Sequence, residues 1–168
     1  QREALKEVLK LDGLSIEHKN TLEDILDSNK NNEIIPKLFV DGAADLHSKT
    51  AGIGGVVYIN EGEVANFSEP LYDKTNNESE YLSLIKGIQV IHELKLDNVN
   101  IFSDSELIVK QINGEYKIKN DRMKKLNDEV KLNLRKLTSW SIEHVRREKN
   151  TRADELSKLG MEEARGSK

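Results

Sequence analysis

The sequence predicts an α/β protein with one five-stranded mixed sheet, flanked by helices and preceded by a short helical segment. Two observations support this prediction. Residues 37–71 contain three apolar runs rich in Val and Ile and divided by Gly and Asn, which is typical of consecutive antiparallel strands. From residue 76 onward, helical spacing alternates with short strand-like runs, which is typical of parallel β-α-β units.

The first 36 residues are interpreted as a separate segment. Residues 3–11 and 15–27 carry apolar residues at helical spacing, and residues 28–37 are polar, Asn-rich and closed by a proline, as in a linker. We expect a helical extension and linker over residues 1–36 and the main domain over residues 37–168. The extension contains no aromatic side chain for base stacking, so it is expected to pack on the main domain or to mediate self-association.

The elements of the main domain follow from the period of its apolar residues. Three strands are predicted over 37–43, 51–62 and 63–71, with the sequence NEG as the turn between the last two. The remaining expected elements are helices over 76–96, 105–112, 121–137 and 151–164 and strands over 98–104 and 139–145. This order gives three antiparallel strands followed by parallel ones.

Composition excludes several classes of protein. The 168 residues are 36% hydrophobic and include no cysteine, which allows one ordinary core and rules out disulfides and thiolate metal sites. No apolar run approaches the roughly 18 residues of a membrane span, and the first thirty residues are charged throughout. We expect a soluble, cytoplasmic protein with no membrane partner.

Charge is distributed unevenly along the chain. The net charge is −4, yet residues 110–152 carry 13 Lys and Arg against 6 Asp and Glu, whereas residues 1–109 carry 10 against 20. A segregated basic segment is suited to binding phosphates. The alternative is that its lysines only form the solvated faces of helices.

Four carboxylates stand at positions that one chemistry would explain. Asp41 interrupts an apolar strand, where a buried carboxylate requires a cation, and Asp104 ends a strand just before a helix. Glu80 is expected in the first turn of the long helix and Asp154 in the first turn of the last helix. The alternatives are that Asp104 is an N-cap and that the helix dipole stabilises the other two.

Taken together, these carboxylates predict a site for hard divalent cations. Oxygen ligands suit Mg²⁺ or Mn²⁺. Two such ions about 4 Å apart activate a water and stabilise the leaving oxygen of a phosphodiester. We therefore expect Asp41, Glu80, Asp104 and Asp154 to ligate two Mg²⁺ ions, with Mn²⁺ as the alternative.

Four motifs follow one another along the chain: VDGA, TNNESEY, IFSDSELIVKQINGEYKIKN and HVRREKNTRADELS. In this order and spacing, over residues 37–160, they resemble ribonuclease H of type 1 in its compact form without the basic protrusion. The resemblance implies the ribonuclease H-like fold and an endoribonuclease that hydrolyses the RNA strand of RNA-DNA hybrids. It also implies 5′-phosphate and 3′-hydroxyl products, the four carboxylates as the catalytic quartet, and residues 37–168 as the catalytic domain.

The resemblance assigns roles to further residues. His144 matches the histidine that assists proton movement or product departure, and an imidazole exchanges protons near neutral pH. Asn76 and Asn77 match asparagines that touch the hybrid, while Gly42 and Ser105 are expected beside the RNA strand and its 2′-hydroxyls. The alternatives are a surface histidine and a helix cap formed by the asparagines.

Basic side chains are expected around this site. The residues near His144 that would border it and attract phosphates are Arg146, Arg147, Lys149 and Arg152, with ordinary surface charge as the alternative. Because the segment NGEYKIKN is short, hybrid binding would depend on Lys117, Lys119 and the basic helix that follows. Two other functions stay open: another nuclease on the same fold, or a non-catalytic hybrid-binding module.

Overall fold

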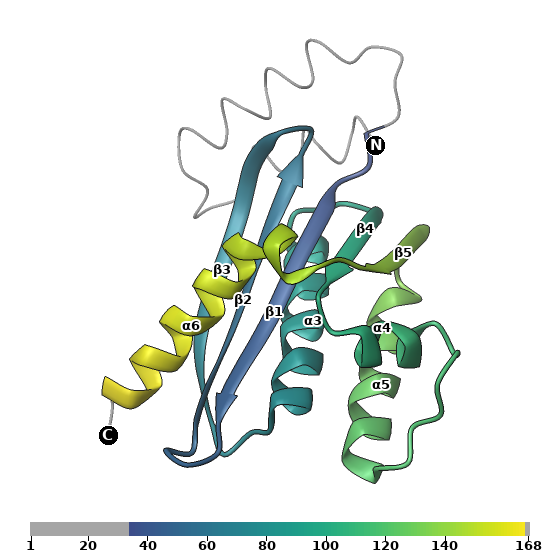
Figure 1. The fold of residues 1–168 in the computed structure, drawn as a ribbon. Helices are drawn as coiled ribbons and strands as arrows, with labels where there is room; N and C mark the ends of the chain where they lie inside the picture. The colour runs from purple at the N-terminus through teal and green to yellow at the C-terminus, as the bar shows by residue number, and fades with distance from the viewer. Residues whose placement is uncertain (1–33, 167–168) are drawn as a thin grey trace.

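The computed structural model describes residues 34–166, whose fold is shown in Figure 1. Its strands are β1 (Lys37–Asp45), β2 (Thr50–Ile59), β3 (Gly62–Tyr72), β4 (Asn98–Ser103) and β5 (Ser139–His144). They form one sheet in the spatial order β3-β2-β1-β4-β5, antiparallel from β3 to β1 and parallel from β1 to β5. The predicted five-stranded mixed sheet is confirmed. The helices expected over 3–11 and 15–27, and any self-association through them, lie outside the described residues.

The turn between β2 and β3 shows why these strands form a hairpin. Asn60 adopts a φ of 56°, in the left-handed region that asparagine tolerates better than most residues. Asn60 and Glu61 therefore form a two-residue turn between Ile59 and Gly62, and these two residues pair with each other in the β2–β3 ladder. The NEG turn was predicted at this place, with the strand boundaries displaced by one to three residues.

The helices are α3 (Asn76–Glu93), α4 (Glu106–Ile112), α5 (Asp121–Leu134) and α6 (Thr151–Gly166), with a short 3-10 turn η1 (Arg147–Lys149) before α6. α3 begins after a capping box, in which the Thr75 hydroxyl accepts from the N–H of Glu78 and the Glu78 carboxylate accepts from the N–H of Thr75. It ends before the predicted residue 96 because Lys95 has a φ of 61°. Within residues 34–166, no helix is long and apolar enough to cross a membrane.

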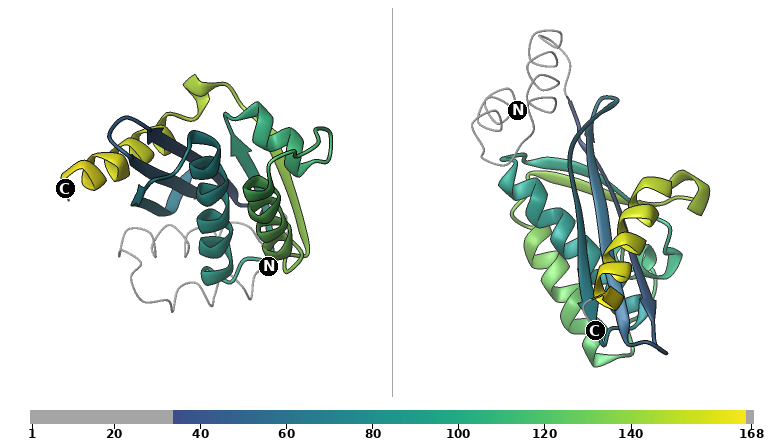
Figure 2. Two further views of the ribbon diagram at one scale, coloured as in Figure 1. Left: turned by 90° about the horizontal axis from the view of Figure 1, so that it is seen from below. Right: turned by 90° about the vertical axis from the view of Figure 1, so that its left-hand side faces the viewer.

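Helices cover both faces of the sheet. Figure 2 shows α3 and α5 on one face and α6 on the other. The main core lies between the sheet and α3, where Leu38 and Val40 of β1 are fully buried against the helix at Gly87. Alternation along β1 directs the intervening residues, Phe39 and Asp41, toward the α6 side.

Two close approaches fix the helices on the sheet. A Cβ at Gly52 or Gly54 of β2 would collide with the backbone or side chains of α6 around Ser157. A Cβ at Gly42 of β1 would collide with the backbone of α3 at Ser79 and Glu80. Small residues at these positions therefore bring α3 and α6 close to β1 and β2 from opposite faces.

Candidate active site

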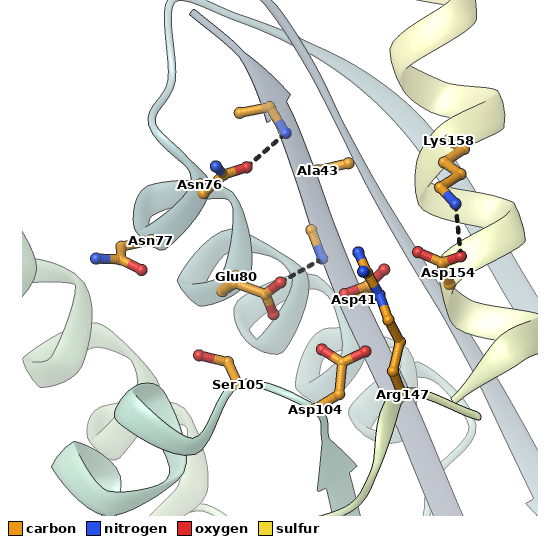
Figure 3. A pocket seen from close by; sticks show the side chains of 12 residues that line it. Asp41, Ala43, Asn76, Asn77, Glu80, Asp104, Ser105, Arg147, Asp154 and Lys158 are labelled. Carbon is orange, nitrogen blue, oxygen red and sulfur yellow. Dashed lines mark hydrogen bonds and ion pairs between the residues drawn. The ribbon is translucent and has the colours of Figure 1, made fainter. Parts of the chain in front are cut away.

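A cavity of about 520 Å³ lies where β4 ends beside the middle of β1. In the parallel register Val40 pairs with Ser103, so the next residue on each strand is a carboxylate, Asp41 on β1 and Asp104 after β4. Helix starts and the loop before α6 complete the wall. The lining residues, most of them labelled in Figure 3, are Asp41, Gly42, Ala43, Ala44, Asn76, Asn77, Glu80, Asp104, Ser105, Arg147, Asp154 and Lys158.

Three carboxylates converge in this cavity. Asp41, Glu80 and Asp104 each place one carboxylate oxygen within 4.8 Å of the other two. Asp41 and Glu80 are 4% and 9% exposed, so two of the three are largely withdrawn from water. Within residues 34–166 none of the three forms an ion pair. A cluster of this kind is costly unless protons or cations compensate it.

The pKa values of the two buried carboxyl groups are raised by this cost. Burial, followed by the charge of Asp104, raises the pKa of Asp41 to about 7. Burial, followed by the charge of Asp41, raises the pKa of Glu80 to about 10. Without metal, the cluster therefore holds a proton at neutral pH, on Glu80.

The donors around the cluster leave one buried oxygen without a partner. The N–H of Gly42 donates to Glu80 Oε1 at 3.2 Å, and the hydroxyl of Ser157 donates to Asp41 Oδ2 at 3.0 Å. The other oxygen of Glu80, Oε2, is buried and accepts no hydrogen bond from any donor in residues 34–166. An unpaired oxygen in an all-carboxylate cluster fits a hard cation such as Mg²⁺ or Mn²⁺.

The fourth predicted ligand, Asp154, faces the same cavity, but unlike the other three carboxylates it forms an ion pair within residues 34–166. Its carboxylate pairs with Lys158 Nζ at 2.9 Å, one turn further along α6. Partial burial alone would raise the pKa of Asp154, yet the hydrogen bond and charge of Lys158 and a hydrogen bond from Asp41 hold it below its ordinary value. Asp154 therefore stays ionised beside the cluster without belonging to its three mutually adjacent oxygens.

The ordinary alternatives for two carboxylates are wrong. Ser105, not Asp104, is the N-cap of α4, because its hydroxyl accepts from the N–H of Ile108. Glu80 is not in the first turn of α3, as the sequence suggested, since the helix begins at Asn76 and its first-turn acid is Glu78. Neither carboxylate is explained by helix capping, which leaves the cavity as the feature they share.

All four predicted substrate contacts line the cavity: Gly42 on β1, Asn76 and Asn77 at the start of α3, and Ser105 before α4. The N-cap of α3 is Thr75, so Asn76 and Asn77 are not caps. The side-chain oxygen of Asn76 accepts from the N–H of Ala44 at 2.9 Å, which directs its amide nitrogen away from β1 (Figure 3). Gly42 also lines the cavity, but its missing side chain makes room for α3.

His144 lies outside the cavity that the carboxylates line. It is the exposed last residue of β5 and is not among the residues that line the cavity. It lies near Glu106, whose pKa is lowered mainly by the hydrogen bond and charge of Lys110 and to a smaller extent by the charge of His144. The structure places His144 on β5 opposite Ser103, the residue before Asp104, but outside the lining of the cavity.

The four basic residues near His144 have different positions. Of these four, only Arg147 lines the main cavity, where its charge helps to lower the pKa of Asp154. Lys149 and Arg152 line a smaller cavity of about 130 Å³ beside Phe39 and Tyr58, and Arg152 pairs with Glu63 at 3.1 Å. The expectation that both would border the carboxylates is wrong, because Arg152, two residues before Asp154 on α6, faces β3 instead.

Sequence reasoning missed two residues of α6. Lys158 lies four positions after Asp154, a spacing that places two side chains on one face of a helix and could have suggested the pair. Ser157 carries no comparable signal, because its contact with Asp41 depends on how α6 packs against β2.

Known proteins share both the sequence pattern and the fold. The family model described as "Reverse transcriptase-like" matches residues 39–160. Ribonuclease HI of Halobacterium salinarum is 28% identical over 127 residues, which cover 75% of this chain and 64% of that protein. A bifunctional protein of Mycobacterium tuberculosis is 30% identical over 126 residues, which cover 74% of this chain and 35% of that protein. The chain thus spans less than two thirds of these relatives.

Solved structures agree with the sequence matches. The crystal structure titled LC11-RNase H1 in complex with RNA/DNA hybrid superposes with a TM-score of 0.72 at 31% identity, covering 77% of this chain and 98% of that one. The sequence match and the shared fold lead to the same family. The chain belongs to the reverse transcriptase-like family and, within it, to the type 1 ribonucleases H.

Proposed function

We propose that this chain is an endoribonuclease that hydrolyses the RNA strand of RNA-DNA hybrids with the help of two divalent metal ions. The observation that carries the proposal is the convergence of Asp41, Glu80 and Asp104 within 4.8 Å of one another in a cavity. Family membership supports an RNA-DNA hybrid as the substrate, since LC11-RNase H1, a relative of the same fold, has a crystal structure in complex with an RNA/DNA hybrid.

The residues present are suited to holding the ions. Asp41, Glu80 and Asp104 would hold one ion, and Asp154, freed from Lys158, would contribute to the second. When bound, such ions supply an activated water and neutralise charge on the leaving oxygen of a phosphodiester. Mg²⁺ is expected, and Mn²⁺ has the same preference for oxygen ligands.

The other residues of the cavity orient the substrate. Arg147 and Lys158 offer cationic groups to the scissile phosphate and its neighbours. Asn76 and Asn77 offer amide groups, and the Ser105 hydroxyl and the backbone at Gly42 would face the RNA sugar. Hydrolysis adds water to phosphorus and breaks its bond to O3′, which leaves a 5′-phosphate and a 3′-hydroxyl. His144 would take up or return a proton only after bound substrate draws it toward the cavity.

Cleavage of a panel of duplexes tests the proposal. End-labelled RNA-DNA, RNA-RNA and DNA-DNA duplexes of one sequence are incubated with the protein in Mg²⁺, in Mn²⁺ and in excess chelator. We expect cleavage of the RNA strand of the hybrid in either metal and none in chelator. The product ends are read by their ligation to an acceptor that requires a 5′-phosphate.

The same panel separates the competing functions. Preferential cleavage of DNA-DNA would indicate another nuclease on the same fold, and hybrid binding without cleavage would indicate a non-catalytic module. An Asp104→Asn sample, purified identically, shows whether any cleavage arises from a contaminating nuclease. Undiminished cleavage in chelator, or equal cleavage by the variant, would overturn the proposal.

A further inference from the structure

Ser157 is a fully buried residue of α6 whose hydroxyl reaches the carboxylate cluster. Its Oγ lies 3.0 Å from Asp41 Oδ2 and 2.8 Å from the backbone oxygen of Asp154. A hydroxyl has one hydrogen, so the two oxygens compete for it or share it, and an ionised carboxylate attracts it more strongly than a carbonyl. Ser157 thereby joins the first carboxylate to the helix that carries the fourth.

The position of this hydroxyl is set by the sheet. The backbone of α6 at Ser157 lies directly against Gly52 and Gly54, where no Cβ would fit. One residue earlier, the Ser68 hydroxyl of β3 donates to the backbone oxygen of Leu156 at 2.7 Å. Ser157 is therefore held from two strands and cannot withdraw from Asp41 without displacing the helix.

Asp41 needs such a restraint. Its other close neighbours in the cavity are carboxylates, which repel it when ionised. We propose that Ser157 is a positioning residue, whose hydroxyl holds the Asp41 carboxylate in the orientation that places an oxygen within 4.8 Å of those of Glu80 and Asp104. The inference rests on the proposed function and adds a residue that prepares its metal site.

Calorimetric titration of the full chain with Mn²⁺, in the absence of nucleic acid, tests the inference. Ser157→Ala should weaken Mn²⁺ binding by about tenfold, the change expected when one hydrogen bond to a charged group is lost. In cleavage assays the variant should need a higher Mg²⁺ concentration for half-maximal turnover, while its KM for the hybrid at saturating Mg²⁺ stays unchanged.

Two serine variants serve as matched controls. Ser68→Ala removes a hydroxyl that anchors α6 but contacts no carboxylate. Ser83→Ala removes a fully buried hydroxyl that, like that of Ser157, donates to the backbone oxygen three residues earlier. Both should bind Mn²⁺ as the wild type does, although their melting temperatures fall about as much as that of Ser157→Ala.

The outcomes separate this inference from the proposed function. Wild-type Mn²⁺ affinity in Ser157→Ala would overturn the inference. An equal loss of Mn²⁺ affinity in Ser68→Ala would overturn it too, because it would indicate that only the packing of α6 on the sheet matters. A wild-type protein that binds Mn²⁺ but cuts no hybrid would overturn the proposed function alone, because the titration decides the role of Ser157 without substrate.

Discussion

The two sides of the cavity hold the same chemical group in opposite electrostatic states. On the side formed by β1, β4 and α3, the carboxylates of Asp41 and Glu80 are buried and their pKa values are raised. On the α6 side, Asp154 is paired with Lys158 and its pKa is lowered. From the sequence alone, all of these acids were predicted to be ionised ligands of one metal site. Their difference arises from which element carries each one and which cation it meets.

This difference indicates what each side is prepared for. A group of three carboxylates, two of them buried and none in an ion pair within residues 34–166, is unstable as a set of charges, so it has a strong tendency to bind metal ions or protons. A carboxylate that already has a cation is stable without metal. The side that lacks cations is thus where the first divalent ion would bind, and on the α6 side Lys158 would meet phosphates once Asp154 turns to the second ion.

The largest effect is expected from neutralising the buried side. Asp41→Asn or Asp104→Asn should lower turnover by about a thousandfold or more, because each removes a ligand from a centre that stabilises the transition state by several kcal/mol. The melting temperature in metal-free buffer should stay the same or rise, since repulsion in the cluster is relieved. Single-turnover cleavage and thermal unfolding check both parts. A marked fall in melting temperature would show that these carboxylates are structural.

His144 lies on neither side of the cavity. Its substitution tests whether a group outside the cavity contributes to turnover. His144→Ala should lower turnover by about a hundredfold, the lower end of the range for a positioned proton-transfer group, because the metal ions share that role. His47, an exposed histidine between β1 and β2, provides the matched control, and His47→Ala should be neutral. Wild-type turnover and pH dependence in His144→Ala would contradict a role in proton transfer.

Charge beyond the cavity should affect binding more than chemistry. Lys117, Lys119 and Lys124 are exposed before and on α5, where the sequence placed a basic segment. Reversing all three to Glu should raise the KM for the hybrid by about tenfold with a smaller change in turnover, and should reduce the salt dependence of binding. Lys37→Glu, at the exposed start of β1, is the control for a single reversal. An unchanged salt dependence would mean that the segment is only a solvated surface.

The smallest expected effect is the change of folding stability with pH. The direction of this change differs between the two sides of the cavity. Because the pKa values of Asp41 and Glu80 are raised to about 7 and about 10, the folded metal-free protein holds more protons than the unfolded chain above pH 5. Its stability should therefore fall as pH rises from about 5 to 9, with a decrease in melting temperature of roughly 5 °C. Saturating Mg²⁺ should reverse this fall. Stability that rises over this range would contradict the shifts.

Single substitutions separate the two sides in the same unfolding experiment. Glu80→Gln should flatten the decline with pH, because it removes a proton-binding group whose pKa is raised. Asp154 has a lowered pKa, so its contribution is present above the ordinary Asp value and is lost on acidification. Asp154→Asn should leave the decline above pH 5 unchanged and cause a small loss of stability. Identical pH profiles for the two variants would remove the distinction between the sides.

Much of the fold could be predicted from local pattern. The period of apolar residues located each strand and helix of residues 37–164, and the antiparallel-then-parallel order followed from their succession. The start of α3 at residue 76 was predicted correctly, but its C-terminal end and the turn η1 were not, because they depend on the backbone at single residues such as Lys95. Packing of α6 on glycines of β2 was also missed, since no local pattern encodes which helix meets which strand.

Prediction of the site had a similar limit. Asp41 was recognised because it interrupts an apolar strand and Asp104 because it follows a strand end, and the register of β1 and β4 places them side by side. His144 was grouped with them by the family resemblance and Arg152 by its place near the last motif, and neither lines the cavity. Ser157 was missed because its contact joins residues 116 positions apart.

Anomalous diffraction from crystals of the full chain soaked in Mn²⁺ tests the central claim most directly. If the buried side is the metal site, a manganese peak should lie within coordination distance of Asp41, Glu80 and Asp104, and it should disappear in Asp41→Asn crystals. A peak bound only at surface acids, or the same peak in the variant, would contradict the assignment of this cluster as the catalytic metal centre.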